Sequence, residues 1–339
     1  QNPLEWMENN RQLNKKYKVL TTVFAEITPI ENLTIRSQFG ADFTNSTAFM
    51  QSMPSYAPNN GNGAAGRAAY NALNLTVTNT INYRTTIDGR HKLNFMLGQE
   101  GVDYRYEGFQ LITQGQNNDF LTNVSSGTRV TSWSDTTDSD YGFLSFFGRG
   151  EYNYDNRYFA EFSVRADGSS RFGKNNRWGT FPSVALAWRI SQENFFEPLR
   201  DIVNDLKVRA SYGITGQQDG IANYSYMPVY TISQDGAQYV FNGVPIYTYR
   251  PEKYNPDLKW ETTKAWNVGL DFGLINNRIT ASFDYYKRTT EDLLASVPCA
   301  AGTNFAKYIL SNVGNVDSEG FELSINANII ENKDWSWNV

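Results

Sequence analysis

Apolar and polar residues alternate one by one along much of this chain. The pattern is clearest in five segments: 158–167, 183–190, 206–212, 268–274 and 321–329. Successive side chains of a β-strand point to opposite faces, so strict alternation predicts strands with one apolar and one polar face. A helix repeats near 3.6 residues per turn and would mix the two classes of residue. The pattern therefore predicts an all-β protein.

The connections between the predicted strands come in two lengths. Tight turns are predicted at Thr28–Asn32, Ile87–Gly89, Asp155–Arg157, Ile275–Asn277 and Glu331–Asp334. The Asp-Gly pair in the second of these favours a hairpin, because both residues tolerate positive φ angles. Long polar stretches, rich in Gly, Asn, Pro, Ser and Asp, separate the hairpins and read as loops, roughly at 44–69, 108–140, 216–257 and 290–318.

This order of strand, short turn, strand and long loop predicts about twelve strands of around ten residues or more. Such strands suit tilted membrane-spanning segments. Short periplasmic turns with long extracellular loops are typical of a transmembrane antiparallel up-and-down β-barrel of the outer membrane. One connection, 192–205, is expected to form a helical turn on the periplasmic rim.

Composition alone does not decide between a membrane protein and a soluble one. The mean hydropathy is -0.52, with 40% hydrophobic and 15% aromatic residues, and a transmembrane barrel has similar values because only alternate residues face lipid. Soluble alternatives with the same alternation are a β-sandwich, a propeller and a β-rich glycan-binding or hydrolytic domain. Strand length and the one-sided placement of the long loops favour the barrel.

Catalytic and nucleic-acid-binding functions find little support in the sequence. The net charge is -5 and no basic patch indicates nucleic acid. Cys299 and His91 are the single cysteine and histidine. No nucleophile motif, phosphate loop or metal-ligand spacing is present, so we expect no enzyme activity and no cofactor. No apolar run reaches the roughly 18 residues of a membrane helix. The chain also begins without Met or a signal peptide, and we expect it to be a piece of a longer protein.

Four sequence phrases together resemble the SusC/RagA family of TonB-dependent outer-membrane transporters of Bacteroidetes. They are RADGSSRFGKNNRWG (165–179), LKVRASYGITGQ (206–217), NPDLKWETT (255–263) and NVGNV (312–316), followed by Gly320-Phe321-Glu322. Their order and spacing make the resemblance specific over residues 141–339. Ala166 departs from it, because an aromatic residue is expected before Asp-Gly-Ser-Ser.

The resemblance implies that residues 1–339 are part of a barrel domain of roughly 22 strands. A plug domain and the closing C-terminal strands would lie outside this chain. It also implies import of an oligosaccharide or peptide, energised by the TonB complex, with a SusD-like surface lipoprotein as a lid. Membrane lipid and lipopolysaccharide would surround the barrel. The alternative in the same membrane is a passive or structural barrel within another envelope complex.

The Asp167–Trp178 segment has two interpretations. Arg171, Lys174 and Arg177 would contact solute or plug if the segment faces the lumen. The favoured interpretation is a structural turn, in which Gly168 and Gly173 take strained φ values and Asp167 pairs with Arg171.

Arginines at lumen-facing positions of the predicted strands need acidic partners, such as Glu161 and Asp271. These arginines are Arg84, Arg165, Arg189 and Arg209. We expect them to build a hydrogen-bonded wall and to grip the plug. The acids Asp135, Asp138 and Asp140 suggest calcium, but solvated loop acids are favoured because no Gly and later Glu complete a calcium loop.

Aromatic residues supply the remaining candidates. Trp133, Trp178, Trp260 and Trp266 lie near predicted strand ends, where membrane-interface anchoring is expected. Tyrosines crowd one long loop and suit stacking on sugars or contact with the lid, although packing within the loop is equally compatible. The predicted ligand or lid contacts are Trp133, Arg171, Arg177, Tyr224, Tyr226, Tyr230, Tyr239 and Tyr247.

Overall fold

The computed structural model describes residues 2–121, 123–136, 139–232, 237–300, 302–303 and 305–339. The helices are short: α1 (Pro3–Asn9), and the 3-10 helices η1 (Ala57–Asn59), η2 (Val124–Ser126), η3 (Ile190–Gln192) and η4 (Asn194–Leu199). Asn2 caps α1, because its Oδ1 accepts a hydrogen bond of 3.1 Å from the Leu4 amide. Over the described ranges, the structure has no helix with the length and apolar character needed to cross a membrane.

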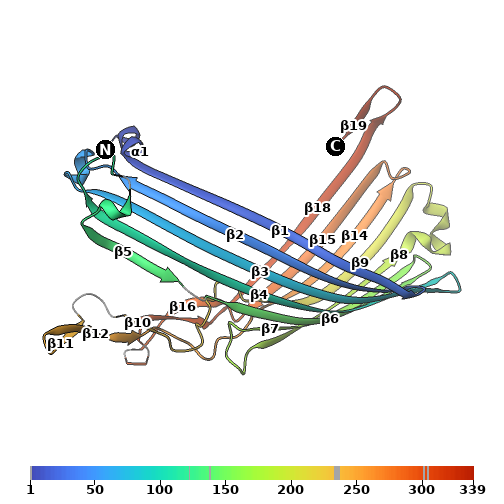
Figure 1. The fold of residues 1–339 in the computed structure, drawn as a ribbon. Helices are drawn as coiled ribbons and strands as arrows, with labels where there is room; N and C mark the ends of the chain where they lie inside the picture. Colours follow the sequence, from blue (N-terminus) through green and yellow to red (C-terminus); the bar gives the residue numbers. More distant parts are fainter. Residues whose placement is uncertain (1, 122, 137–138, 233–236, 301, 304) are drawn as a thin grey trace. The chain divides into compact units, whose positions relative to one another are not determined.

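One 13-stranded sheet contains most of the strands found in the described residues. Its order is β1 (Asn10–Ile30), β2 (Leu33–Ser52), β3 (Gly63–Ile87), β4 (His91–Gln116), β6 (Tyr141–Tyr154), β7 (Tyr158–Ser169), β8 (Trp178–Arg189), β9 (Val203–Gln217), β14 (Glu261–Leu274), β15 (Ile279–Glu291), β18 (Asn315–Glu331) and β19 (Ser336–Asn338), with β5 (Arg129–Thr136) paired to β4. Strands that follow one another pair side by side (Figure 1). This is the predicted up-and-down order, with β1 and β19 as its two ends.

The chain divides into two compact units, and β1 to β4 and β6 contribute residues to both. Unit 1 comprises Gln1–Ala25, Ser37–Thr78 and Gly101–Gly142. Unit 2 comprises Glu26–Arg36, Asn79–Glu100 and Phe143–Val339.

Within unit 1, a turn at Asn60 and Gly61 (φ of 49° and 74°) joins β2 to β3. Asp119 secures this connection, since its Oδ1 accepts a hydrogen bond of 3.1 Å from the Ser55 amide.

Unit 2 contains the predicted tight turns. Asp88 and Gly89 both have positive φ, at 50° and 66°, and connect β3 to β4. Asp155 and Asn156 do the same between β6 and β7, with φ of 52° and 56°. The other three predicted turns, around 31, 276 and 333, also fall between consecutive strands of the sheet. Short-range turn chemistry was therefore a sound guide to the hairpins.

The register of unit 2 places the apolar residues of neighbouring strands in rows on one face. Trp266 of β14 lies opposite Tyr212 of β9, with ring centroids 4.4 Å apart, and Leu270 lies opposite Phe283 of β15. The outer row remains open: Trp266 is 58% exposed and Phe321 of β18 is 71% exposed. A soluble β-sandwich would bury such a face against a second sheet. The exposed apolar face instead matches the lipid-facing side of a transmembrane barrel.

The predicted long loops are shorter than expected, and some contain strands. The stretch 44–69 contributes to β2 and β3, and only residues 53–62 connect them. The other stretches contain β5, the ends of some long strands and three pairs of short strands. The short strands are β10 (Tyr230–Ile232), β11 (Gln238–Phe241), β12 (Val244–Tyr247), β13 (Tyr249–Pro251), β16 (Leu294–Pro298) and β17 (Tyr308–Asn312). These strands are only three to five residues long, so each is too short for an alternating pattern to mark it.

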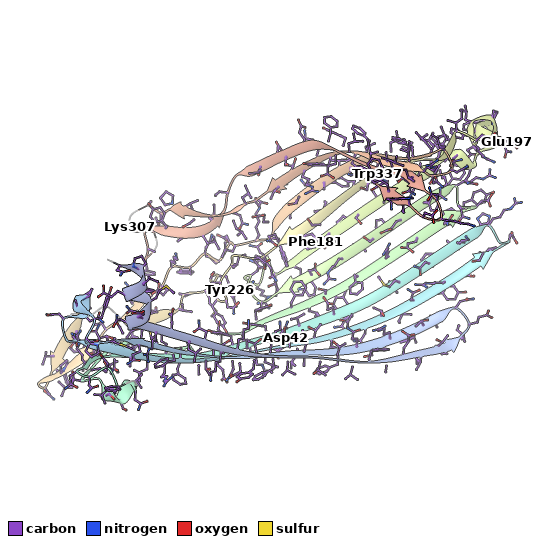
Figure 2. The ribbon with its side chains drawn as sticks, turned by 90° about the horizontal axis from the view of Figure 1, so that it is seen from above. Asp42, Phe181, Glu197, Tyr226, Lys307 and Trp337 are labelled. Atoms are coloured by element: carbon purple, nitrogen blue, oxygen red, sulfur yellow. The ribbon has the colours of Figure 1, made fainter. Side chains whose placement is uncertain are left out.

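The connection 192–205 contains the predicted helical turn as η4, with η3 directly before it, and residues 203–205 belong to β9. Figure 2 shows Glu197 of η4 at the short-turn end of unit 2, with Phe181 toward the opposite end. Glu193 joins this connection to the sheet: the Tyr158 hydroxyl and the Trp188 indole donate hydrogen bonds of 2.6 and 3.0 Å to its Oε1. The hydrogen bond from Tyr158, and to a smaller extent that from Trp188, lowers the pKa of Glu193 below its ordinary value of 4.5.

We expect Glu193→Gln to lower the thermal unfolding temperature at neutral pH. A lowered carboxyl pKa stabilises the folded state above pH 4.5, and this contribution is lost as the pH falls through the lowered pKa. The difference between wild type and variant should therefore shrink in acid. Heat-modifiability of the detergent-solubilised protein measures it, and Glu197→Gln is the matched control. An equal difference at every pH would contradict the assigned role.

Candidate functional site

The polar face of the unit 2 sheet carries arginines that are bound by carboxylates on the same face. Arg165 of β7 lies 2.9 Å from Glu100 and 2.6 Å from Asp167, and it also donates to Ser145 Oγ. These charge-assisted bonds offset the free-energy cost of partly burying the guanidinium. Together they hold three strands in one hydrogen-bonded wall.

Arg209 of β9 forms a second such cluster. Its guanidinium lies 3.1 Å from Asp271 and 2.7 Å from Asp284, which stand on β14 and β15. Gly269 of β14 makes this reach possible, because a Cβ there would lie 2.8 Å from both Arg209 Nη1 and Asp284 Oδ1. A glycine on the middle strand thus lets one arginine bridge three strands.

The expected partners of the wall arginines were correct in part. Asp271 does pair with Arg209, but Glu161 pairs with Arg149 at 2.9 Å. Arg189 instead forms an ion pair with Asp205 at 3.2 Å. Arg84 forms no ion pair within the described ranges.

A pocket of about 980 Å³ opens on this polar face within unit 2. Its floor is made by small side chains of β8 and β9, among them Ala185, Ala187 and Ser211. Charged and amide side chains surround this floor: Arg84, Lys92, Asn94, Glu151, Glu161, Lys207, Arg209 and Asn267. The pocket is large enough to receive a side chain or a small polar solute.

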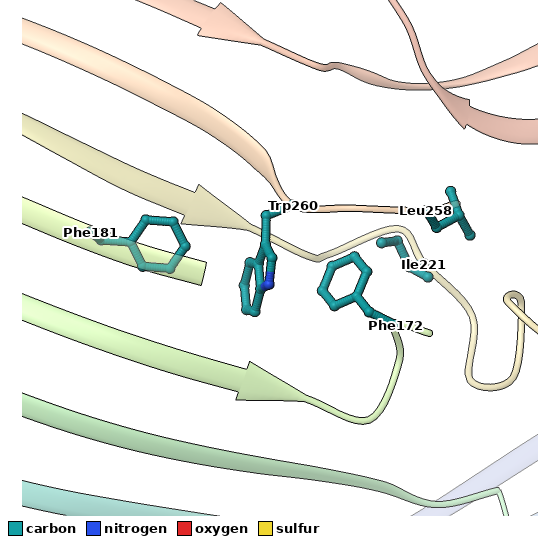
Figure 3. Packing of buried hydrophobic residues seen from close by; sticks show 5 residues of the cluster. All are labelled: Phe172, Phe181, Ile221, Leu258 and Trp260. Atoms are coloured by element: carbon teal, nitrogen blue, oxygen red, sulfur yellow. The ribbon is translucent and has the colours of Figure 1, made fainter. Parts of the chain in front are cut away.

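A compact apolar cluster lies at the long-loop end of the same strands. Phe172 and Leu258 are fully buried, and Trp260, Ile221 and Phe181 are nearly so (Figure 3). The Trp260 ring lies 4.9 Å from that of Phe172 and 5.5 Å from that of Phe181, centroid to centroid. These residues come from three stretches far apart in the sequence: 172–181, 221 and 258–260. We call this cluster the hub, because it fastens the long loops to the sheet.

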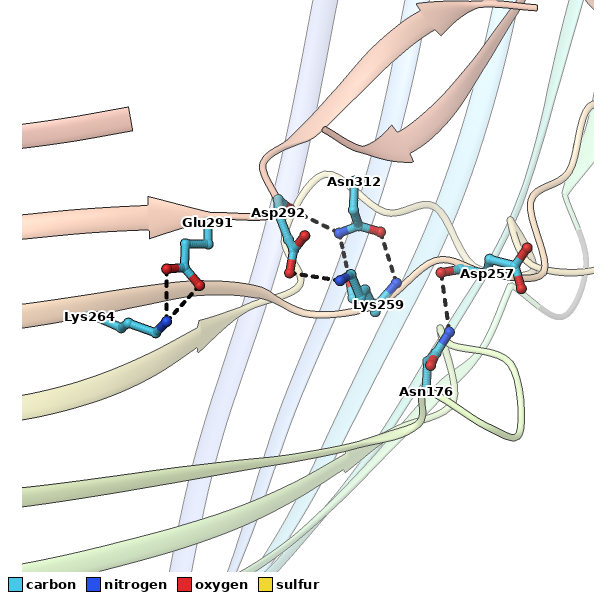
Figure 4. Close-up of polar contacts among 7 residues, drawn as sticks. All are labelled: Asn176, Asp257, Lys259, Lys264, Glu291, Asp292 and Asn312. Atoms are coloured by element: carbon cyan, nitrogen blue, oxygen red, sulfur yellow. Dashed lines mark hydrogen bonds and ion pairs between the residues drawn. The ribbon is translucent and has the colours of Figure 1, made fainter. Parts of the chain in front are cut away.

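Polar bonds complete the hub. The Asn312 amide group accepts from the Lys259 backbone N–H at 2.9 Å and donates to the Lys259 carbonyl at 2.8 Å (Figure 4). Asn176 donates to the Asp257 carbonyl, and Lys259 lies 2.8 Å from Asp292. The sequence phrases 165–179, 255–263 and 312–316 therefore meet in one place, and Ile214 of the fourth phrase packs against the same cluster.

The structure corrects our interpretation of the Asp167–Trp178 segment. Gly168 and Gly173 do not have positive φ, and Asp167 pairs with Arg165 rather than with Arg171. The glycines are needed for close approach instead. A Cβ on Gly168 would lie 2.9 Å from the Trp178 ring, and one on Gly173 would lie 2.9 Å from a backbone oxygen of the 255–263 phrase.

Two predicted contact residues belong to this segment. Arg171 donates from Nε to Asn223 Oδ1 at 3.1 Å, which ties the segment to the next long loop. The Arg177 carbonyl accepts from the Trp260 indole at 3.3 Å. Arg177 is thus joined to the hub, and Arg171 is joined to the loop that carries Ile221. Trp133 lies in β5 opposite Leu111 of β4.

The tyrosine-rich loop forms an arm with two hairpins. β10 pairs with β13 next to the sheet, and β11 pairs with β12 farther out (Figure 1). Tyr230, Tyr239 and Tyr247 are 67%, 54% and 52% exposed. Tyr224, with φ of 68°, and Tyr226 precede the arm, and Tyr226 lies near the long-loop end in Figure 2. The structure thus brings three of the five tyrosines together on an exposed arm.

Among the tryptophans, the interface interpretation fails for Trp260, which is 7% exposed in the hub. Trp178 and Trp266 are 52% and 58% exposed, as anchors should be. Of the suggested calcium acids, Asp138 lies outside the described residues. No group of metal-binding side chains occurs among those described.

Sequence reasoning did not find the hub. Phe172, Leu258 and Asn312 carry no local pattern that marks them as neighbours. The one available signal was that the four sequence phrases occur together in a fixed order. Residues of these phrases contact one another in the hub.

Comparison with known proteins gives consistent results. A family model described as TonB dependent receptor-like, beta-barrel, matches residues 8–339. The TonB-dependent receptor SusC of Bacteroides thetaiotaomicron is 36% identical over 341 residues, covering 100% of this chain and 33% of that protein. TonB-dependent receptor P39 of Formosa agariphila is 32% identical, covering 99% of this chain and 32% of its own length. The chain therefore spans about a third of the length of these relatives.

Solved structures show the same fold. The structure of the RagAB peptide transporter aligns with a TM-score of 0.85 at 32% identity, covering 97% of this chain and 36% of that one. BauA, the ferric preacinetobactin receptor of Acinetobacter baumannii, aligns with a TM-score of 0.53 at 13% identity, over 94% of this chain and 44% of its own. The second likeness concerns the fold alone.

We expect Trp260→Ala to destabilise the hub by about 3–5 kcal/mol, since it removes a large buried ring. The long loops should then become sensitive to protease, with cleavage at Arg250 and Lys253, while the strands stay protected. Trp335→Ala removes an indole that is 73% exposed and is the matched control. Equal protease resistance of the two variants would contradict the anchoring role of the hub.

Proposed function

This chain belongs to the β-barrel of the TonB-dependent receptors, which are outer-membrane proteins, and on that basis we propose that it is part of the wall of a nutrient importer. The imported solute is an oligosaccharide or a peptide. Energy comes from the TonB complex, acting on a plug that lies outside these residues. A SusD-like lipoprotein covers the extracellular mouth.

One observation supports this proposal most strongly. Apolar residues lie on one face of the unit 2 sheet and charged residues on the other, and the strand register keeps the two classes apart from strand to strand. Apolar rows such as Tyr212 with Trp266 stand on one face, and the Arg209 cluster stands on the other. A wall with an apolar outer face and a charged inner face separates lipid from a polar interior. RagAB, whose structure this chain resembles at 32% identity, is a peptide transporter, and a peptide is one of the two proposed solutes.

The arm is the proposed contact for solute or lid. Tyr230, Tyr239 and Tyr247 combine a large apolar area with a polar tip, which suits sugar rings and protein surfaces alike. From Gln238 to Tyr249 the arm has no charged side chain, so its contacts depend on area rather than on ion pairs. Trp133, Arg171, Arg177, Tyr224 and Tyr226 remain secondary candidates.

The full-length protein in its own outer membrane should take up labelled oligosaccharides or peptides only while the proton gradient is intact. The expected result is loss of uptake on gene deletion and on addition of a protonophore, because TonB draws on that gradient. Uptake that persists without the gradient would instead indicate the passive barrel. A protein recovered in the soluble fraction would overturn both.

Replacement of Tyr230, Tyr239 and Tyr247 by Ser should weaken binding of solute or lid, by about 30-fold if one of them is a hot spot of 2 kcal/mol. Binding to the purified full-length protein measures the change. Tyr308→Ser, on an equally exposed tyrosine of β17 (54%), is the control. Unchanged binding by the triple variant would remove the arm from the site.

A further inference from the structure

Six aromatic rings follow one another along the short-turn end of the unit 2 sheet. Successive ring centroids are 6.0, 4.8, 6.1, 6.4 and 6.5 Å apart in the order Tyr152, His91, Tyr154, Tyr158, Trp188 and Phe195. Tyr154 and Tyr158 flank the turn at Asp155 and Asn156. The rings therefore lie at the end that is periplasmic in a barrel of this type. We call these six residues the aromatic row.

The strand register places the aromatic row on the lipid-facing side of the sheet. Residues directly opposite each other on paired strands share a face. Tyr158 lies opposite Trp188, Trp188 lies opposite Val208, and Val208 lies opposite Leu270. Leu270 belongs to the exposed apolar face through its partner Phe283. The aromatic row is thus the periplasmic margin of the face that meets lipid.

A groove of about 410 Å³ lies next to the aromatic row on this face. Its lining includes Tyr158 and Trp188 of the row and, between them and the middle of the sheet, Ala160, Leu186 and Ala210. The last three lie opposite one another on β7, β8 and β9. Across β14, β15 and β18 the same register position is filled by larger side chains, Val268, Tyr285 and Phe321. The two alanines therefore leave a recess in a face that is otherwise covered by bulky residues.

The polar tips at the border of the groove are bonded to the protein itself. The Tyr158 hydroxyl and the Trp188 indole donate to Glu193 at 2.6 and 3.0 Å. The Tyr152 hydroxyl lies 2.8 Å from His91 Nδ1. The groove thus presents apolar surface to an occupant. A sugar or a peptide backbone would leave its own polar groups unpaired there, at a cost in free energy that a hydrocarbon does not incur.

We propose that this groove holds an acyl chain of a phospholipid from the periplasmic leaflet of the outer membrane. The groove is continuous with the lipid-facing side of the sheet and lies at the end where that leaflet meets the barrel, whereas lipopolysaccharide occupies the opposite leaflet. Rings of Tyr and Trp suit the boundary between acyl chains and headgroups. Phe195, which is 67% exposed on η4, extends the apolar surface past the end of β8.

A shaped recess is needed for such a site because lipid surrounds the whole outer face. Transfer of an acyl chain from lipid to an apolar protein surface exposes no new apolar area to water, so the hydrophobic effect does not favour one place over another. Close van der Waals packing does, because each additional atomic contact adds a small attraction. The recess at Ala160 and Ala210 supplies contacts on its floor and its sides, which the filled rows cannot.

The first test fills the groove. The double variant Ala160→Leu and Ala210→Leu keeps both positions apolar, so the face still suits lipid while the recess is lost. Native mass spectrometry of the full-length protein, purified from outer membranes in mild detergent, should show retained phospholipid in the wild type. The double variant should retain roughly tenfold less, which corresponds to about 1.4 kcal/mol of binding free energy. Ala327→Leu, on the same face of β18 but outside the groove, is the control and should retain as much as the wild type.

Three results of this experiment would overturn the proposal: a wild type without retained phospholipid, equal retention by the double variant, or retention of lipid A in place of phospholipid. Heat-modifiability of each variant reports whether the barrel has folded.

A second measurement uses the wild type alone and does not depend on folding of a variant. The full-length protein is reconstituted in phospholipid vesicles with increasing fractions of a phospholipid that carries a diazirine in its acyl chain. After illumination, labelling of the peptide that contains Leu186 should saturate at a low fraction of the probe, as a site does. Labelling of the peptide that contains Phe321 should rise in proportion to the fraction, as ordinary contact with bulk lipid does. Proportional labelling of both peptides would show that the groove is not a site.

The inference is independent of the proposed function, since it requires a barrel in the outer membrane and not import. Uptake that persists without a proton gradient would remove the importer and leave the lipid site intact. An energised importer whose groove shows neither retention nor saturable labelling would refute only the lipid site.

Discussion

Pairing of every backbone N–H and C=O group is the constraint on which the rest of this structure depends. In lipid no water can satisfy these groups, so the chain must run as strands that each bond to a neighbour on both sides. Strands joined by short turns, such as Asp88-Gly89, achieve this with the fewest unpaired groups. Because successive side chains then alternate between two faces, one sequence can present Trp266 to lipid and Arg209 to the interior without conflict.

The same constraint explains which elements the sequence predicted. Alternation from Leu206 to Tyr212 and the positive-φ turns at Asp88 and Asp155 are local signals, and they were confirmed. Strand ends were less predictable. The run Gly63 to Ala69 consists mainly of small residues and was assigned to a loop, but it extends β3, because its backbone bonds to neighbouring strands regardless of its side chains.

The polar contacts show a similar division. Asp167 was expected to pair with Arg171, four positions on, within a structural turn between two strands. Residues two apart share a face in a strand, and Asp167 accordingly binds Arg165 within β7. Asp271 was a correct partner for Arg209 because both lie on lumen-facing positions of paired strands. The hub lay beyond such reasoning, since Phe172 and Trp260 are brought together only by the order of strands in the sheet.

The base of the arm is closed by a hydrogen bond of 2.7 Å from the Glu252 amide to the Val229 carbonyl. Everything between these two residues leaves the sheet and returns to the same point. Loop-closure entropy rises only slowly with length, so inserted or exchanged residues there change the stability of the barrel little. The arm can therefore change in evolution as a unit without loss of the barrel. An engineered chimera could exchange the arm in the same way, because the hub would still anchor its ends.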